Sequence, residues 1–152
     1  AALGLPETAV VTATHSPVQA SLGLPFVIVE LNGITSLTDC APDITAIRKG
    51  AQEHPAGLDF AIYAYVRSGD QIDARMFAPL DEIPEDPATG SAAATLAAVL
   101  TEELDAPQTL TIAQGMDMGR PSLILATTQN QRPVPVTISG TALRVMEGHL
   151  VT

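Results

Sequence analysis

Alternating apolar and polar positions divide much of the chain into short strands. Residues 60–67 show this most clearly, because every second position from Phe60 to Val66 falls on one face and Tyr63 and Tyr65 fall on the other. Similar runs of β-branched and apolar residues, bounded by Gly, Pro or Ser-Gly-Asp turns, recur along the chain. The sequence therefore predicts strands at residues 8–13, 26–31, 60–67, 72–77, 109–114, 122–128, 134–139 and 142–151.

One segment breaks this pattern. Residues 91–104 are rich in alanine and leucine and carry no charge until Glu102. They are typical of a helix, and a helix that is apolar on all sides is buried on all sides. A second, shorter helix is predicted from Asp43, a suitable N-cap residue, toward Gln52.

The predicted elements are seven or eight strands, one buried helix and one peripheral helix. Because most strands follow one another without a crossover helix, the pattern is α+β rather than a βαβ repeat. The sheet has to curl around the apolar helix to shield it from water. We therefore expect an α+β fold, with a curled, mixed, barrel-like sheet wrapped around a central buried helix. Residues 1–152 are expected to form a single domain.

Composition narrows the classes of function. The chain has 17 acidic and 7 basic residues, a formal net charge of −10, and no cluster of Lys or Arg. Nucleic acid and anionic membrane surfaces are therefore poor partners. The longest nearly apolar run, residues 92–100, is far shorter than the ~20 residues of a membrane helix. Cys40 is the only cysteine, so no intrachain disulfide can form and a cytoplasmic location is expected.

The residues before the apolar helix carry candidate chemistry. An acidic connection containing Glu85 and Asp86 leads into Thr89-Gly90-Ser91, where the helix opens. The first N–H groups of a helix lack internal acceptors and carry partial positive charge, which suits a carboxylate or another anion. Asp86 is a candidate acid or base beside that end. On the residues alone, Thr89 or Ser91 could equally be an ordinary N-cap, and Asp86 could cap a backbone N–H.

The remaining candidates are weaker. Two glycines and Pro121 force an irregular connection at residues 114–122, and Arg120 in this connection is one of only seven cationic residues in the chain. We expect Arg120 to pair with an acidic group or a ligand, and a structural pair is favoured. Neither the three histidines nor Cys40 have metal-ligand spacing, and the chain contains no P-loop and no GxGxxG motif. We therefore expect no metal and no cofactor.

Three blocks stand out together: MFAP at residues 76–79, PEDPATGSAA at 84–93 and QGMDMGRPS at 114–122. In sequence and spacing they resemble the phenazine-biosynthesis isomerase-like (PhzF-type) family. This resemblance implies a diaminopimelate-epimerase-like fold of two similar domains with the active site between them. It also implies a cofactor-free proton-transfer isomerase, of the kind known for a dihydro-hydroxyanthranilate. By the same resemblance, the N–H groups of Gly90 and Ser91 hold the substrate carboxylate, and Asp86 lines the cleft.

The resemblance covers only the C-terminal half of a family member. The N-terminal half would supply a glutamate general base and a histidine, in blocks resembling SEST and GHP that this chain lacks. The leading hypothesis is therefore the C-terminal domain of an isomerase, with Asp86 catalytic and Thr89, Gly90 and Ser91 binding a small carboxylate substrate. Its expected partner is the missing N-terminal domain, a second chain or another copy in a homodimer, because an orphaned apolar face favours association. The alternative is a non-catalytic domain that binds small anions or self-associates.

Overall fold

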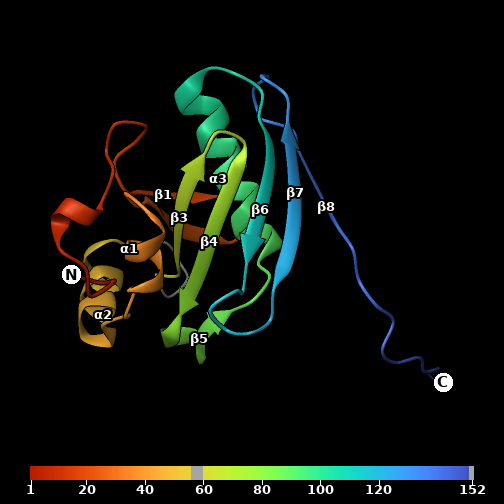
Figure 1. The fold of residues 1–152 in the computed structure, drawn as a ribbon, viewed down its shortest axis with the longest axis horizontal. Helices are drawn as coiled ribbons and strands as arrows, with labels where there is room; N and C mark the ends of the chain where they lie inside the picture. Colours follow the sequence, from red (N-terminus) through yellow and green to blue (C-terminus); the bar gives the residue numbers. More distant parts are fainter. Residues whose placement is uncertain (56–59, 151–152) are drawn as a thin grey trace.

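The strands of the chain form one sheet in the computed structural model, which describes residues 1–55 and 60–150 (Figure 1). These described residues contain β1 (Val18–Ser21), β2 (Pro25–Glu30), β3 (Ile62–Ser68), β4 (Gln71–Ala78), β5 (Ile83–Asp86), β6 (Thr109–Gln114), β7 (Ser122–Thr128) and β8 (Val136–Gly140). The order across the sheet is β1-β2-β3-β4-β6-β7-β8, and β5 pairs with β4 beside this path.

The sheet is mixed because two of its neighbouring pairs are parallel. β2 runs parallel to β3, and β4 runs parallel to β6, whereas the other pairs are antiparallel. A parallel pair needs a crossover connection. The first crossover contains α1 (Ile34–Thr38) and α2 (Ile44–Glu53), and the second contains α3 (Gly90–Leu104).

α3 is the central helix that the sequence predicts. It packs against β1 and β2 at one end of the sheet and against β7 and β8 at the other, so the sheet must curl around it. Its buried residues, which include Leu96 and Leu100, form one core with Tyr63 and Tyr65. The α+β fold with a curled sheet around a buried helix is thus confirmed.

The opposite face of the sheet is covered by α1 and α2. A second core joins Leu37 of α1 and Ile47 of α2 to Ile62 and Ala64 of β3. The predicted division of β3 into a tyrosine face and an aliphatic face is therefore correct. The predicted N-cap of α2 is also confirmed, because the Asp43 carboxylate accepts from the N–H groups of Thr45 and Ala46 at 2.8 and 3.2 Å.

Two predicted strands are wrong. Residues 8–13 begin inside a 3-10 helix, η1 (Glu7–Ala9), and only Val10 among them forms an isolated bridge, to Leu31. Residues 142–150 form no strand, and Val151 lies outside the described residues. Three elements are not predicted from the sequence: β1, α1 and β5. β5 follows the 3-10 helix η2 (Pro79–Asp81), where a loop was expected.

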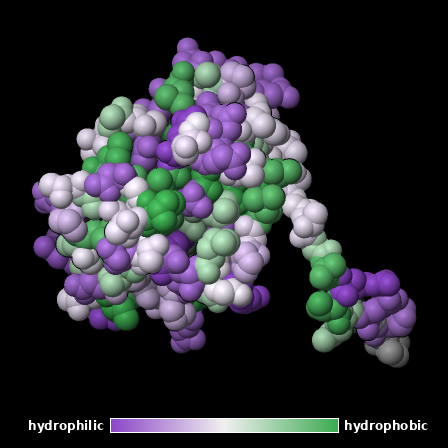
Figure 2. Space-filling model, viewed as in Figure 1, coloured by the Kyte–Doolittle hydropathy of each residue, from purple (hydrophilic) through white to green (hydrophobic). Residues whose placement is uncertain are grey.

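The C-terminal segment, residues 141–150, leaves the body of the molecule after β8 (Figures 1 and 2). Its apolar side chains are almost fully exposed, for example Leu143 at 90% and Leu150 at 99%. A strand needs a partner for its backbone, and this segment has none within the described residues, which explains the failed prediction. Among the helices of the described chain, none combines the length and apolar character that crossing a membrane requires.

Candidate active site

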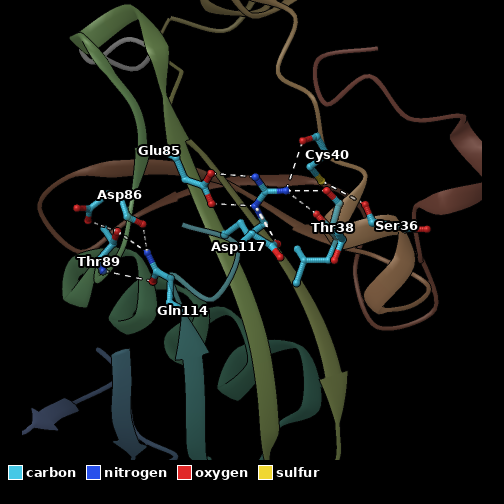
Figure 3. Close-up of polar contacts among 10 residues, drawn as sticks. Ser36, Thr38, Cys40, Glu85, Asp86, Thr89, Gln114 and Asp117 are labelled. Atoms are coloured by element: carbon cyan, nitrogen blue, oxygen red, sulfur yellow. Dashed lines mark hydrogen bonds and ion pairs between the residues drawn. The ribbon is translucent and has the colours of Figure 1, made fainter. Parts of the chain in front are cut away.

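β5 divides its two acidic side chains between opposite faces of the sheet. Successive residues of a strand point to opposite sides, so Glu85 and Asp86 cannot share one site. Figure 3 shows Glu85 directed toward the loop of Thr38 and Cys40, and Asp86 directed toward Thr89. The two carboxyl groups that the sequence places side by side therefore have separate environments.

Glu85 is a structural residue. Its carboxylate accepts two hydrogen bonds from Arg75, at 2.8 and 2.9 Å, and Arg75 also donates to the carbonyls of Leu37 and Thr38 at 3.0 Å. The Glu85 hydrogen bond, opposed in part by burial, raises the pKa of Arg75. The Arg75 guanidinium also lies 4.8 Å from the centre of the Phe77 ring. Glu85 is thus occupied in joining β4 and β5 to the α1 region, and Asp86 remains as the candidate acid or base.

Asp86 lies in a network of hydrogen bonds at the start of α3 (Figure 3). The Thr89 hydroxyl donates to Asp86 Oδ2 at 2.5 Å. Gln114, at the end of β6, donates to the Asp86 carbonyl at 2.7 Å and to Thr89 Oγ1 at 2.9 Å. The structure therefore brings Asp86 and Thr89 together as the sequence predicts, and it adds Gln114, for which the sequence predicts no role.

The N-terminus of α3 has no side-chain cap. Thr89 occupies the N-cap position, but its hydroxyl donates to Asp86 and accepts from Gln114 instead of accepting from the helix N–H groups. The first turn of α3 contains no acidic residue. Within the described part of the chain, the N–H groups of Gly90, Ser91 and Ala92 have no hydrogen-bond acceptor, whereas the next N–H, of Ala93, donates to the Thr89 carbonyl. Gly90 is half-buried and Ser91 is exposed, so their N–H groups are accessible to an anion, whereas Ala92 is fully buried. The helix dipole favours an anion at this end.

Gly90 is not required by the fold. Its φ does not lie in the left-handed region, and a Cβ built on it would meet nothing closer than Ile138 Cγ2 at 3.7 Å, an ordinary contact. The absence of a side chain therefore serves access to the helix end more than packing. The neighbouring Ser91 side chain is exposed, which leaves its own N–H approachable from solvent.

Open space adjoins this helix end on two sides. A cavity of about 750 Å³ is lined by Ala88, Gly90, Ser122, Ile138 and Gly140, among others. A smaller one of about 130 Å³ is lined by Thr89 and Ser91 and by apolar residues that include Phe26, Met76 and Ile83. The larger volume falls within the range of small-molecule sites, and it is open to solvent.

The turn between β6 and β7 contacts the loop that follows Asp86. Gly115 has φ +78°, and the Arg120 N–H donates to its carbonyl at 3.0 Å. Ser122 donates its hydroxyl hydrogen to the Pro87 carbonyl at 2.7 Å. The structural ion pair favoured for Arg120 is not found among the described residues, and its side chain is exposed. Asp117, the acidic residue nearest to Arg120 in the sequence, instead lies 3.5 Å from Arg75.

The remaining chemically active side chains do not form a site. No group of three or more His, Cys, Asp or Glu residues in the described ranges could hold a metal ion. His15 is buried, with its Nε2 2.8 Å from the Tyr65 hydroxyl, whereas His54 and His149 are exposed. Burial raises the pKa of the Cys40 thiol to about 11, so this thiol is a weak nucleophile.

Comparison with known proteins gives one consistent answer. The family described as phenazine biosynthesis-like protein matches residues 2–148. A trans-2,3-dihydro-3-hydroxyanthranilate isomerase of Pseudomonas chlororaphis is 33% identical over 133 residues, which are 85% of this chain and 45% of that protein. An uncharacterised isomerase of Mesorhizobium japonicum is 32% identical over 160 residues, 99% of this chain and 53% of that protein. The chain thus spans about half the length of the relatives it matches.

Solved structures with a similar fold come from the same family. A PhzF-family phenazine biosynthesis protein of Bacillus anthracis superimposes with a TM-score of 0.79 at 19% identity, over 99% of this chain and 53% of that one. A phenazine biosynthesis PhzC/PhzF protein of Clostridium difficile gives a TM-score of 0.58 at 22% identity, over 84% and 45%. At these identities the likeness extends to the fold, a curled sheet around a central helix.

Proposed function

The chain belongs to the phenazine biosynthesis-like protein family, and from that premise we propose that it is the C-terminal part of an isomerase that moves a proton on a small carboxylate substrate. The relatives named as isomerases support this activity, and the chemistry at the start of α3 supports the substrate class. The first compound to test is the one named for the Pseudomonas relatives, trans-2,3-dihydro-3-hydroxyanthranilate.

The observation that carries the proposal is the pairing of an uncapped helix end with a carboxyl group. The N–H groups of Gly90, Ser91 and Ala92 lack acceptors among the described residues, and the Asp86 carboxyl is tied to the N-cap residue Thr89. A substrate carboxylate bound by these N–H groups would be held next to Asp86. Negative charge that develops on the substrate during proton transfer would be stabilised by the same donors.

Asp86 is proposed to give or take the proton. A proton transfer between carbon atoms needs an acid, a base and charge stabilisation, all of which a protein can supply, so the proposal calls for no cofactor. One carboxyl group and a helix end provide only part of this set. We propose that the general base comes from the remaining part of the isomerase, in agreement with the coverage of about half the relatives' length.

Association with that remaining part has candidate contact residues. Leu123 and Leu125 are exposed on the outer face of β7, and Leu143 and Val145 are exposed on the C-terminal segment. Burial of apolar side chains drives association, and such residues are otherwise costly to leave in water. We propose that they pack against the part that completes the site, either in the same polypeptide or in another chain.

The experiment uses the full natural polypeptide that carries this sequence. Turnover of trans-2,3-dihydro-3-hydroxyanthranilate is followed by NMR of substrate and product, for the parent and for D86N, S91P and S91A. We expect D86N to lower kcat by about 10²-fold or more, the low end of the general acid–base contribution. S91P, which removes one helix N–H but is tolerated in a first turn, should lower kcat/KM more than S91A, which keeps it.

Two results would overturn the proposal. Undiminished turnover by D86N would remove Asp86 from the reaction, and equal kcat/KM for S91P and S91A would remove the Ser91 N–H from substrate binding. Binding of the compound by the parent without any turnover would favour a non-catalytic, anion-binding domain instead.

A further inference from the structure

Gln114 is a fully buried amide at the end of β6, with an exposed fraction of 0%. Its Oε1 accepts from the Tyr63 hydroxyl at 3.2 Å and from the Thr89 N–H at 3.3 Å. Its Nε2 donates to the Asp86 carbonyl at 2.7 Å and to Thr89 Oγ1 at 2.9 Å. Both lone pairs of the oxygen and both hydrogens of the nitrogen are therefore used, which is the full capacity of the group.

These partners fix the orientation of the amide. The Thr89 N–H can only donate, so it must face Oε1, and the Asp86 carbonyl can only accept, so it must face Nε2. In a flipped amide, the nitrogen would face the Thr89 N–H, a donor against a donor. The oxygen would face the Asp86 carbonyl, an acceptor against an acceptor, and both contacts are buried. The direction of every hydrogen bond that follows is then determined.

The consequence reaches the Asp86 carboxyl group. Thr89 Oγ1 already accepts from Gln114, so its single hydrogen is free to be donated to Asp86 Oδ2. That oxygen is held as an acceptor, and a proton on it would meet the Thr89 hydrogen. The other oxygen, Oδ1, has no hydrogen-bond partner among the described residues. The network thus makes the two carboxylate oxygens of Asp86 unequal.

Tyr63 provides the second hydrogen bond to the oxygen of the Gln114 amide. It is fully buried in the core beneath α3, and its hydroxyl donates to Gln114 Oε1. Burial first, and then the negative charge of Asp86, raise the pKa of Tyr63 above its ordinary value, so its hydroxyl keeps its hydrogen. Even without Tyr63, the Thr89 N–H and the Asp86 carbonyl would still orient the amide.

We propose that Gln114 is a positioning residue that, through Thr89, commits Oδ2 of Asp86 to accepting a hydrogen bond and leaves Oδ1 to exchange the proton with the substrate. This proposal rests on the proposed function of Asp86. It states which of the two carboxyl oxygens of Asp86 reacts, and which residues determine this. Gln114 itself does not touch the reacting atoms.

The test begins with a measurement that needs no turnover. The NMR chemical shift of the Asp86 carboxyl carbon is compared at one pH between the chain and Q114E, T89V, T89S and Y63F, because this shift reports the hydrogen bonds that the carboxyl group accepts. Q114E keeps the size of the side chain but replaces the amide that donates to Thr89 Oγ1 and to the Asp86 carbonyl, so the carbon shift should differ from that of the parent. T89V should also change the carbon shift, because it removes the donor to Oδ2, and T89S should restore it. Y63F should change it least.

The same variants are then assayed in the full natural polypeptide. We expect Q114E and T89V to lower kcat by about 10- to 100-fold with KM changed less than kcat, as misplacement of a catalytic group does. T89S should recover most of the loss from T89V. A rise in KM alone, or T89S as impaired as T89V, would contradict the proposal.

The two proposals can fail separately. An Asp86 carboxyl-carbon shift that is the same in folded Q114E and T89V as in the parent would overturn the positioning role of Gln114, whatever the activity. If the carbon shift changes as expected while D86N still turns over substrate, the coupling of Gln114 to Asp86 would stand. The reaction proposed for Oδ1, and with it the catalytic role of Asp86, would then be wrong. If Q114E does not fold, the comparison of T89V with T89S decides.

Discussion

Gly115 offers the sharpest test of how the site is supported. It follows β6 directly, with φ +78°, in the left-handed region that only glycine adopts readily. A Cβ placed on it would lie 2.3 Å from the Arg120 carbonyl oxygen and 2.8 Å from the Pro87 carbonyl oxygen. Both neighbours are backbone atoms, so neither can move aside by changing a rotamer. The G115A substitution therefore has to displace the turn or the loop that follows Asp86.

The expected cost has two parts. Left-handed backbone costs a non-glycine residue about 1–2 kcal/mol. Inserting an extra carbon into a well-packed place costs about 1–3 kcal/mol more. Together they predict that G115A lowers the free energy of unfolding by about 2–5 kcal/mol, a large part of the 5–15 kcal/mol that holds an ordinary domain.

The matched control is G90A. Gly90 is the first residue of α3, its φ is not left-handed, and a Cβ there has ordinary clearance. Since alanine is the better helix former by about 0.5–1 kcal/mol, G90A should be at least as stable as the parent. Its expected loss is in substrate binding, because the new methyl group would cover the helix N–H groups.

The assay is urea unfolding followed by far-UV circular dichroism, because the chain contains no Trp. The free energy of unfolding is compared between the parent, G115A and G90A at equal m-values. G115A within about 0.5 kcal/mol of the parent would refute the reasoning, as would an equal loss in G90A.

Three further predictions concern groups away from the helix end. Replacing Arg75 by Met should cost about 3 kcal/mol in urea unfolding, because it leaves the largely buried Glu85 without its guanidinium, and an unchanged stability would contradict that structural role. Y65F should cost about 1–3 kcal/mol, because the Tyr65 hydroxyl lies between His15 Nε2 and Glu30 Oε2 at 2.8 and 3.2 Å; the same unfolding assay would exclude this if Y65F matched the parent. Burial raises the pKa of Cys40 from 9.0 to about 11, so its thiol should react slowly with a disulfide reagent at pH 8 until urea unfolds the chain. Between these two pH values the thiol ionises in the unfolded chain but not in the folded one, so the free energy of unfolding should fall as pH rises from 9.0 to about 11. A native thiol as reactive as the unfolded one would contradict both expectations.

Much of the fold could be predicted because the main elements have strong periodicity. The bounds of β6 and β7 agree with the predicted residues, and α3 begins one residue before its predicted start. β1 was missed because Val18–Ser21 is a short edge strand with polar alternate positions, and its pairing with β2 gives it its structure. The predicted strand at residues 142–151 fails for the converse reason. Its pattern suits a strand, but no neighbouring strand is present in the described chain to complete it.

The site was only partly predictable for a related reason. Asp86 and Thr89 are three residues apart, so their interaction could be expected from local sequence. Gln114 and Tyr63 are 51 residues apart, and their contact with each other and with the Asp86 loop depends on the order of strands in the sheet. The ion pair of Glu85 with Arg75 likewise depends on the pairing of β4 with β5. That pairing could not be predicted, because the acidic residues of β5 are typical of a loop.

The central claim is that the uncapped start of α3 binds a carboxylate. The most direct measurement is an NMR titration of the backbone amides of the chain with 3-hydroxyanthranilate, an aromatic analogue of the compound named for the relatives, at millimolar concentration. We expect the largest shifts at Gly90, Ser91 and Ala92, and weaker binding by S91P. Unchanged amides at these three positions, or larger shifts at the exposed residues 141–150 than at the helix end, would contradict it.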